Sequence, residues 1–241
     1  MNTPLLTGKN AIIYGSGTLG AAVARTFARE GATVFLAGRT RAGLEAIAAD
    51  GGAAHVDVVD ALDDAAVNEH VRAVAAQAGS VDVVFNLTSR GDVQGTPLLD
   101  MDVDDFLAPI VVGTRAEFVI ARAGARAMVE QGSGVILMVT SGSASVLKPS
   151  PEFQMGGTGP ADAAAESFMH YLAGEVGPRG VRVVGLWTAG VNYPDLMKNV
   201  SMLGRGPTVE QFADTAAFVA SDRGSGITAS IVNVSSGVAA H

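Results

Sequence analysis

The stretch Ala11-Ile12-Ile13-Tyr14-Gly15-Ser16-Gly17-Thr18-Leu19-Gly20 runs from an apolar segment into a glycine-rich turn and continues as Ala21-Ala22-Val23-Ala24. This order predicts a strand, a phosphate-binding loop and a helix. Gly15, Gly17 and Gly20 match G-x-G-x-x-G, which allows a tight turn, close approach of a pyrophosphate and close helix packing. The N–H groups at the helix start would hold the anion. The chain has 30 glycines, so coincidence is the alternative, and the position after an apolar strand favours a dinucleotide-binding loop.

Apolar segments alternate with helical patterns along the rest of the chain. The predicted strands are residues 9–14, 33–37, 53–58, 81–86, 134–140, 181–187 and 227–234. The predicted helices are residues 18–30, 41–49, 60–78, 103–131, 161–176 and 208–220. Apolar strands joined by helices imply right-handed crossovers and a sheet that is covered on both faces. We therefore expect an α/β fold: a Rossmann-like, doubly wound, mainly parallel seven-stranded sheet.

Length and composition limit the function classes. The 241 residues are 48% hydrophobic, which suits one domain over residues 1–241, with residues 191–207 as a substrate lid or a core-packing helix. The absence of cysteine excludes disulfides and a cysteine nucleophile, and the four histidines have no metal-ligand spacing. A net charge of −8 argues against nucleic acid as a partner. No signal peptide or membrane-spanning run is visible, so we expect a cytoplasmic protein that binds small molecules.

The end of the second predicted strand decides the cofactor type. An NAD-binding protein usually places an acidic residue there to accept from the ribose 2′-hydroxyl. This sequence has Gly38-Arg39-Thr40-Arg41 instead, and the guanidinium of Arg39 can pair with a 2′-phosphate. The pattern predicts NADP(H), the alternative being a solvated arginine. Asp57, at the end of the third strand, can accept from the adenine amino group, cap the next helix, or do both.

The whole chain resembles the short-chain dehydrogenase/reductase family. The resemblance rests on Val81-Asp82-Val83-Val84-Phe85-Asn86-Leu87-Thr88, on Gly177-Pro178-Arg179-Gly180-Val181-Arg182-Val183 and on Ala220-Ser221-Asp222-Arg223. Of the Asn-Asn-Ala-Gly that normally ends the family's fourth strand, only Asn86 is retained. The predicted cofactor-binding residues are Gly15, Ser16, Gly17, Leu19, Gly20, Arg39, Thr40, Asp57, Val58, Asn86, Leu87, Thr88 and Gly190.

The resemblance also implies a catalytic tetrad of Tyr, Lys, Ser and Asn. Alignment on the family places Ser141 at the serine and Gly113 at the asparagine. It places Thr158 and Asp162 at the tyrosine and lysine, and Met155 at the tyrosine of the enoyl-reductase variant. The chain is therefore expected to be an atypical member that lacks the Tyr, Lys and Asn residues.

These replacements change the chemistry that is expected. A threonine hydroxyl is a far weaker acid than a phenol, and Asp162 would oppose the negative charge that a lysine would favour. Tyr193 is the best-placed substitute phenol, although packing in the lid is its alternative role. Asp162 and Glu166 stand four apart on one helical face, where they form an acid–base pair or a solvated face. The lysines do not fit the vacant position; they are Lys9, Lys148 and Lys198.

Three functions follow from this site, for which the predicted catalytic residues are Ser141, Thr158, Asp162 and Tyr193. The first is an atypical NADP(H)-dependent oxidoreductase acting on a small, apolar carbonyl, enone or imine. The second is a catalytically degenerate protein that binds NADP(H) or a metabolite. The third is a non-redox lyase or isomerase that uses the same pocket, with Asp162 or Glu166 as its base. The family resemblance further implies a homodimer or homotetramer.

Overall fold

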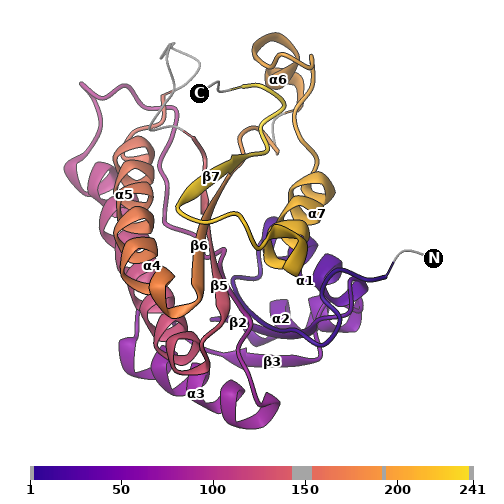
Figure 1. The fold of residues 1–241 in the computed structure, drawn as a ribbon. Helices are drawn as coiled ribbons and strands as arrows, with labels where there is room; N and C mark the ends of the chain where they lie inside the picture. Colours follow the sequence, from indigo (N-terminus) through magenta and orange to yellow (C-terminus); the bar gives the residue numbers. More distant parts are fainter. Residues whose placement is uncertain (1–2, 143–153, 192–193, 239–241) are drawn as a thin grey trace.

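The computed structural model describes residues 3–142, 154–191 and 194–238. Seven strands form one sheet in the order β3-β2-β1-β4-β5-β6-β7, and every neighbouring pair is parallel (Figure 1). The strands are β1 Asn10–Tyr14, β2 Thr33–Gly38, β3 His55–Val58, β4 Val83–Asn86, β5 Gly134–Thr140, β6 Val181–Trp187 and β7 Ser230–Asn233. The structure thus confirms the expected doubly wound, seven-stranded sheet.

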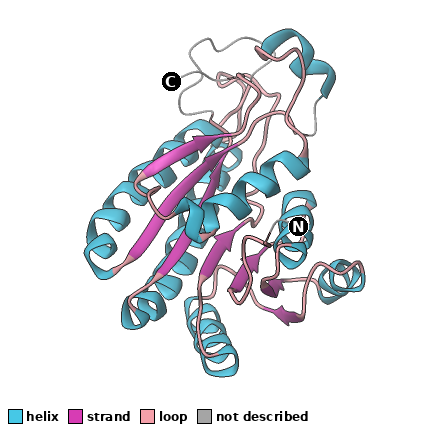
Figure 2. Cartoon of the chain, turned by 45° about the vertical axis from the view of Figure 1, so that its right-hand side comes forward, coloured by secondary structure: helices cyan, strands magenta, loops and turns pink. Residues whose placement is uncertain are grey.

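Two helical layers cover the sheet (Figure 2). One layer contains α3 Asp64–Ala78, α4 Val103–Gln131 and α5 Thr158–Val176, and the other contains α1 Thr18–Arg29, α2 Arg41–Ala49 and α7 Val209–Ala220. Side chains alternate between the two cores along each strand, because successive residues of a strand point to opposite faces. Ile12 and Tyr14 of β1 belong to the first core, and Ala11 and Ile13 belong to the second.

The helix boundaries follow local capping chemistry. α3 begins at Asp64 rather than at residue 60, because the side chain of Asp63 accepts a hydrogen bond from the N–H of Ala66. α5 begins at Thr158 rather than at residue 161, since Pro160 is tolerated in a first helical turn. α7 begins with a capping box, in which Thr208 and Gln211 form reciprocal hydrogen bonds.

In the glycine-rich loop after β1, the absence of a side chain has a different consequence at each of the three glycines. Gly15 has a φ of +119°, and a Cβ on it would collide with the carbonyl oxygen of Leu87 after β4. A Cβ on Gly20 would collide with the carbonyl oxygen of Gly15, so Gly20 lets α1 pack against the loop. A Cβ on Gly17 would meet nothing within 4 Å, which leaves open space in front of the helix N-terminus.

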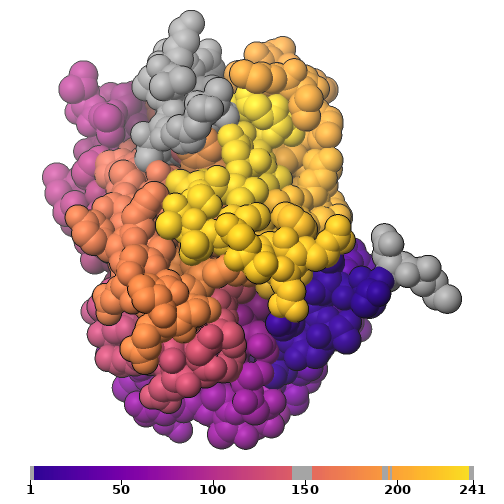
Figure 3. Space-filling view, viewed as in Figure 1, coloured from indigo at the N-terminus to yellow at the C-terminus, as the bar shows by residue number. Residues whose placement is uncertain are grey.

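The segment predicted as a lid or a packing helix contains α6 Pro194–Val200. The side chain of Met197 is buried, and a Cβ on Gly206 would lie 3.1 Å from its Cγ. Beyond α6, the N–H of Leu203 donates to the carbonyl of Ser236, 3.1 Å away, so this segment lies beside residues 236–237 (Figure 3). Met197 therefore packs as a core residue, and motion of a lid stays a prediction.

No helix in the described part of the chain is both long and apolar enough to cross a bilayer.

We expect Gly20→Ala to lower the free energy of unfolding by about 1–3 kcal/mol, because the added methyl group would force the loop and α1 apart. Urea denaturation measures the effect. Gly17→Ala is the matched control and should leave stability almost unchanged, since its Cβ enters open space. Equal stability losses in the two variants would contradict this account of the loop.

Candidate functional site

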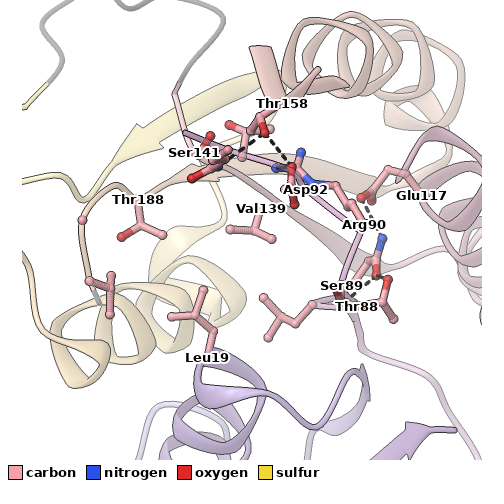
Figure 4. A pocket seen from close by; sticks show the side chains of 16 residues that line it. Leu19, Thr88, Ser89, Arg90, Asp92, Glu117, Val139, Ser141, Thr158 and Thr188 are labelled. Atoms are coloured by element: carbon pink, nitrogen blue, oxygen red, sulfur yellow. Dashed lines mark hydrogen bonds and ion pairs between the residues drawn. The ribbon is translucent and has the colours of Figure 1, made fainter. Parts of the chain in front are cut away.

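A cavity of about 320 Å³ lies at the carboxyl ends of the central strands (Figure 4). The carboxyl edge of a doubly wound sheet, near the point where the strand order reverses, is where such folds bind ligands. The residues that line this cavity come from α1, from the ends of β4, β5 and β6 with the segments that follow them, and from α4 and α5. They are Leu19, Asn86, Leu87, Thr88, Ser89, Arg90, Asp92, Gln94, Glu117, Val139, Thr140, Ser141, Thr158, Thr188, Gly190 and Val191.

One wall of the cavity consists of predicted cofactor-binding residues. Leu19, Asn86, Leu87, Thr88 and Gly190 all line it. The Oδ1 of Asn86 accepts from the N–H of Thr88 at 3.1 Å and from its hydroxyl at 2.7 Å, which fixes the amide orientation. The site is thus built at the end of β4, next to the glycine-rich loop.

The glycine-rich loop meets the requirements of a pyrophosphate site. Gly17 caps α1 without any side-chain hydrogen bond to the helix, and no acidic residue lies in the first turn. The first N–H groups of α1 therefore remain available to an anion, and the open space at Gly17 lets one approach. The residues present fit a dinucleotide.

The predicted adenosine-side residues lie away from the lining of the cavity. Arg39 and Thr40 are exposed at the end of β2, and no described residue forms an ion pair with Arg39. Ser16 faces the same region, since a Cβ on Gly43 would lie 3.5 Å from its Oγ. Val58 is half exposed at the end of β3.

Asp57 has a structural partner in addition to its predicted role. Its Oδ2 lies 3.6 Å from Nε2 of His70, and His70 Nδ1 lies 2.8 Å from the hydroxyl of Tyr14. Burial lowers the pKa of His70, although the carboxylate of Asp57 opposes that shift. The Asp57 side chain is still 47% exposed, so it remains accessible to a ligand.

The opposite wall contains a chain of hydrogen bonds and ion pairs that we call the Arg90 network, formed by Thr158, Asp92, Arg90, Asp162 and Ser141. The Thr158 hydroxyl donates to Asp92 Oδ1 at 2.8 Å, and Asp92 lies 3.2 Å from Arg90 Nη2. Arg90 Nη1 lies 2.6 Å from Asp162 Oδ1. The other oxygen of Asp162 accepts from the Ser141 hydroxyl at 2.6 Å and from the Ser141 N–H at 3.1 Å.

Gly113 on α4 provides the space for Arg90. A Cβ on Gly113 would lie 2.8 Å from Cδ of Arg90 and 3.1 Å from its Cγ. The guanidinium therefore passes over α4 to reach Asp162 on α5. The acidic partners raise the pKa of Arg90 despite its burial, so the network holds a permanent cation.

Sequence reasoning missed Arg90 because it considered only lysines as substitutes for the family's cation. Lys9 instead pairs with Asp222 at 2.9 Å, and Lys198 pairs with Asp195 at 2.7 Å; neither lines the described cavity. Lys148 lies outside the described residues. The available signal was Asp162 itself, because a carboxylate on a buried helix face requires a cationic partner.

Asp162 does not belong to a solvated face. Its side chain is completely buried behind Arg90 and Ser141, and it is absent from the lining of the cavity. Glu166, one turn later, accepts from the Thr140 hydroxyl at 3.2 Å. The solvated-face interpretation is therefore wrong for Asp162. Tyr193, the proposed substitute phenol, lies outside the described residues.

Glu117, one turn beyond Gly113 on α4, is a lining residue that the sequence reasoning also missed. Its side chain is buried, and burial raises the pKa of its carboxyl from about 4.5 to about 8, against opposing effects of Asn86 and Arg90. Asn86 Nδ2 donates to Glu117 Oε2 at 2.9 Å. Its four-residue spacing from Gly113 was the signal in the sequence, since both then share one face of the helix.

Comparison with known proteins identifies the family. Residues 15–239 match the family model described as enoyl-(acyl carrier protein) reductase. The chain belongs to the short-chain dehydrogenase/reductase family. It is therefore an oxidoreductase of the short-chain dehydrogenase/reductase type, and members of this family bind a nicotinamide cofactor.

Individual short-chain dehydrogenase/reductase relatives cover most of the chain. D-threitol dehydrogenase of Mycolicibacterium smegmatis is 29% identical over 233 residues, covering 90% of this chain and 87% of the relative. The NADH enoyl-(acyl-carrier-protein) reductase FabI of Synechocystis sp. is 29% identical over 193 residues, which cover 74% of this chain and 72% of the relative. A short-chain type dehydrogenase/reductase structure from Mycobacterium marinum superposes with a TM-score of 0.87 at 26% identity. The match covers 98% of this chain and 97% of the Mycobacterium marinum chain.

We expect Arg90→Met to lower the free energy of unfolding by about 3 kcal/mol, because it leaves the Asp162 carboxylate buried without its cation. The double variant Arg90→Met/Asp162→Leu should recover most of this loss. Arg126→Met is the control, since Arg126 is exposed and its guanidinium donates a hydrogen bond to Asn68 rather than pairing with a buried carboxylate. Chemical denaturation checks all three, and an Arg90→Met effect no larger than that of the control would refute the buried pair.

Proposed function

We propose that this protein is an NADP(H)-dependent reductase of a small, apolar carbonyl, enone or imine compound, with an atypical catalytic site. The observation that carries the proposal is the shared cavity: residues adjoining the dinucleotide loop face Ser141 and Thr158 across about 320 Å³. Bound there, the reduced cofactor supplies a hydride, so the protein has mainly to position the two reactants.

The preference for NADP(H) over NAD(H) rests on Arg39. Its guanidinium is exposed at the end of β2, where the ribose of a dinucleotide is expected, and it has no ion-pair partner among the described residues. A 2′-phosphate would supply that partner, and residues 39–41, directly after β2, include no acidic side chain that would repel it. The Synechocystis relative carries NADH in its name, so cofactor choice within the family requires a direct measurement.

The cavity supports a small substrate with an apolar part. Leu19, Leu87, Val139 and Val191 provide apolar surface, and the residues of the Arg90 network that line the cavity provide polar groups. A cavity of this volume matches the lower end of ordinary small-molecule sites.

Thr158 in place of a phenol favours a second candidate, a protein that binds NADP(H) or a metabolite without turnover. A lyase or isomerase with Asp162 as its base is less well supported, because Asp162 is fully buried and both its oxygens are engaged.

We further propose that the protein forms a homodimer or homotetramer. Exposed apolar side chains on α4 and α5 support it; they are Leu107, Val111, Phe118 and Tyr171.

The test of function is a titration with NADPH, followed by a screen for its oxidation with ketones, enones and imines. We expect saturable binding of NADPH and turnover with at least one of these classes. Binding without any turnover would favour the second candidate. Turnover of a substrate by cofactor-free protein, lost in Asp162→Asn, would favour a lyase or isomerase instead.

Arg39→Ala should weaken NADPH binding about tenfold or more, because it removes a charge-assisted contact to the 2′-phosphate, and should leave NADH binding almost unchanged. Fluorescence titration measures both dissociation constants. Arg41→Ala is the matched control, since Arg41 is engaged with Glu45 at 3.6 Å within α2. Equal effects of Arg39→Ala on the two cofactors would refute the assignment of the phosphate site.

A further inference from the structure

Glu117 is the one buried carboxyl on the described wall of the cavity, and the Arg90 network does not use it. Glu117 lies on α4 with 6% of its surface exposed, and it lines the cavity (Figure 4). It accepts a hydrogen bond from Asn86 and is close enough to Arg90 for their charges to interact. A carboxyl in such a place is costly unless it is neutral or fully partnered. The hydrogen-bond partners of its two oxygens therefore determine whether the carboxyl can carry a proton.

The two oxygens of Glu117 are not equivalent. Oε2 accepts from Asn86 Nδ2, and the Asn86 amide cannot turn over freely because Thr88 donates twice to its Oδ1. Oε1 is buried and has no hydrogen-bond partner among the described residues. With Oε2 held as an acceptor, a proton on the carboxyl belongs on Oε1. Oε1 then becomes a buried donor without an acceptor, in a residue that lines the cavity.

The groups around Glu117 have opposing effects on the protonation of its carboxyl. Burial keeps the proton in place around neutral pH, while the Asn86 amide and the Arg90 guanidinium both favour the carboxylate that forms when it is lost. A group balanced in this way suits general acid catalysis. The hydroxyls of Ser141 and Thr158, by contrast, already donate to Asp162 and Asp92.

We propose that Glu117 is the proton donor of this site. The inference rests on the proposed reductase activity and narrows its substrates to neutral carbonyls or enones. When the substrate carbon gains a hydride, the electron pair of its π bond moves to the oxygen, directly or through the conjugated system. That oxygen takes the Oε1 proton and becomes a hydroxyl, or an enol that rearranges to the ketone. Glu117 remains as a carboxylate and recovers its proton from water.

The first test uses the apo-protein, labelled with ¹³C at the glutamate side-chain carboxyl carbon and followed by NMR from pH 4 to pH 10. We expect one resonance to titrate near pH 8 and to be absent from Glu117→Gln. The control is Glu130→Gln, an exposed position on the same helix, which should retain that resonance. A Glu117 resonance that titrates below pH 6 would overturn the proposal.

The second test measures the single-turnover rate of NADPH oxidation with whichever ketone or enone the screen identifies. The wild-type rate should fall above about pH 8, where Glu117 loses its proton. Glu117→Gln keeps the shape and the Asn86 contact, so NADPH binding should stay within twofold, while the rate falls about a hundredfold and loses this pH dependence. Glu130→Gln should behave as wild type.

The outcomes separate the two proposals. Turnover that survives in Glu117→Gln at the wild-type rate overturns the role of Glu117 and leaves the reductase proposal standing. If the wild-type protein oxidises NADPH with imines alone, the role of Glu117 is also overturned and the reductase proposal stands, because a cationic imine needs no added proton. Absence of turnover with every probe overturns the reductase proposal and, with it, this one.

Discussion

The buried ion pair between Arg90 and Asp162 is the constraint on which the rest of the site depends. Asp162 is completely buried on α5, and Arg90 reaches it from the segment after β4 and compensates its charge. That reach requires Gly113, whose missing side chain leaves room over α4. The same pair fixes Ser141 through Asp162 and Thr158 through Asp92. One electrostatic requirement thus links four parts of the chain.

The fold could be predicted from the sequence because its signals are local and repeated. Apolar strands and helical spacing each depend on neighbouring residues, and the structure confirms the strands and helices that they predict. The errors lie at boundaries such as the start of α3, where the Asp63 side chain decides the first turn. Short-range hydrogen bonds of this kind shift an element by a few residues without changing the fold.

The site was only partly predictable, since its contacts join residues far apart in the chain. Alignment brought Ser141, Thr158 and Asp162 to attention, but it gave no sign that Arg90 and Asp92 would meet them across the sheet edge. Glu117 was missed for a related reason: a glutamate on a helix is usually solvated, and only the packing of α4 against β4 buries it. Burial is a property of tertiary structure, and so is the pKa shift that follows from it.

The interlocking of Arg90, Gly113 and Asp162 also restricts how this site can change by single steps. A lysine at position 162 would bring a second cation against Arg90, and loss of Arg90 alone would leave a buried carboxylate uncompensated. An asparagine at position 113 would occupy the space through which the Arg90 side chain passes. Each of these single substitutions is therefore destabilising, so positions 90, 113 and 162 can change together far more easily than one at a time.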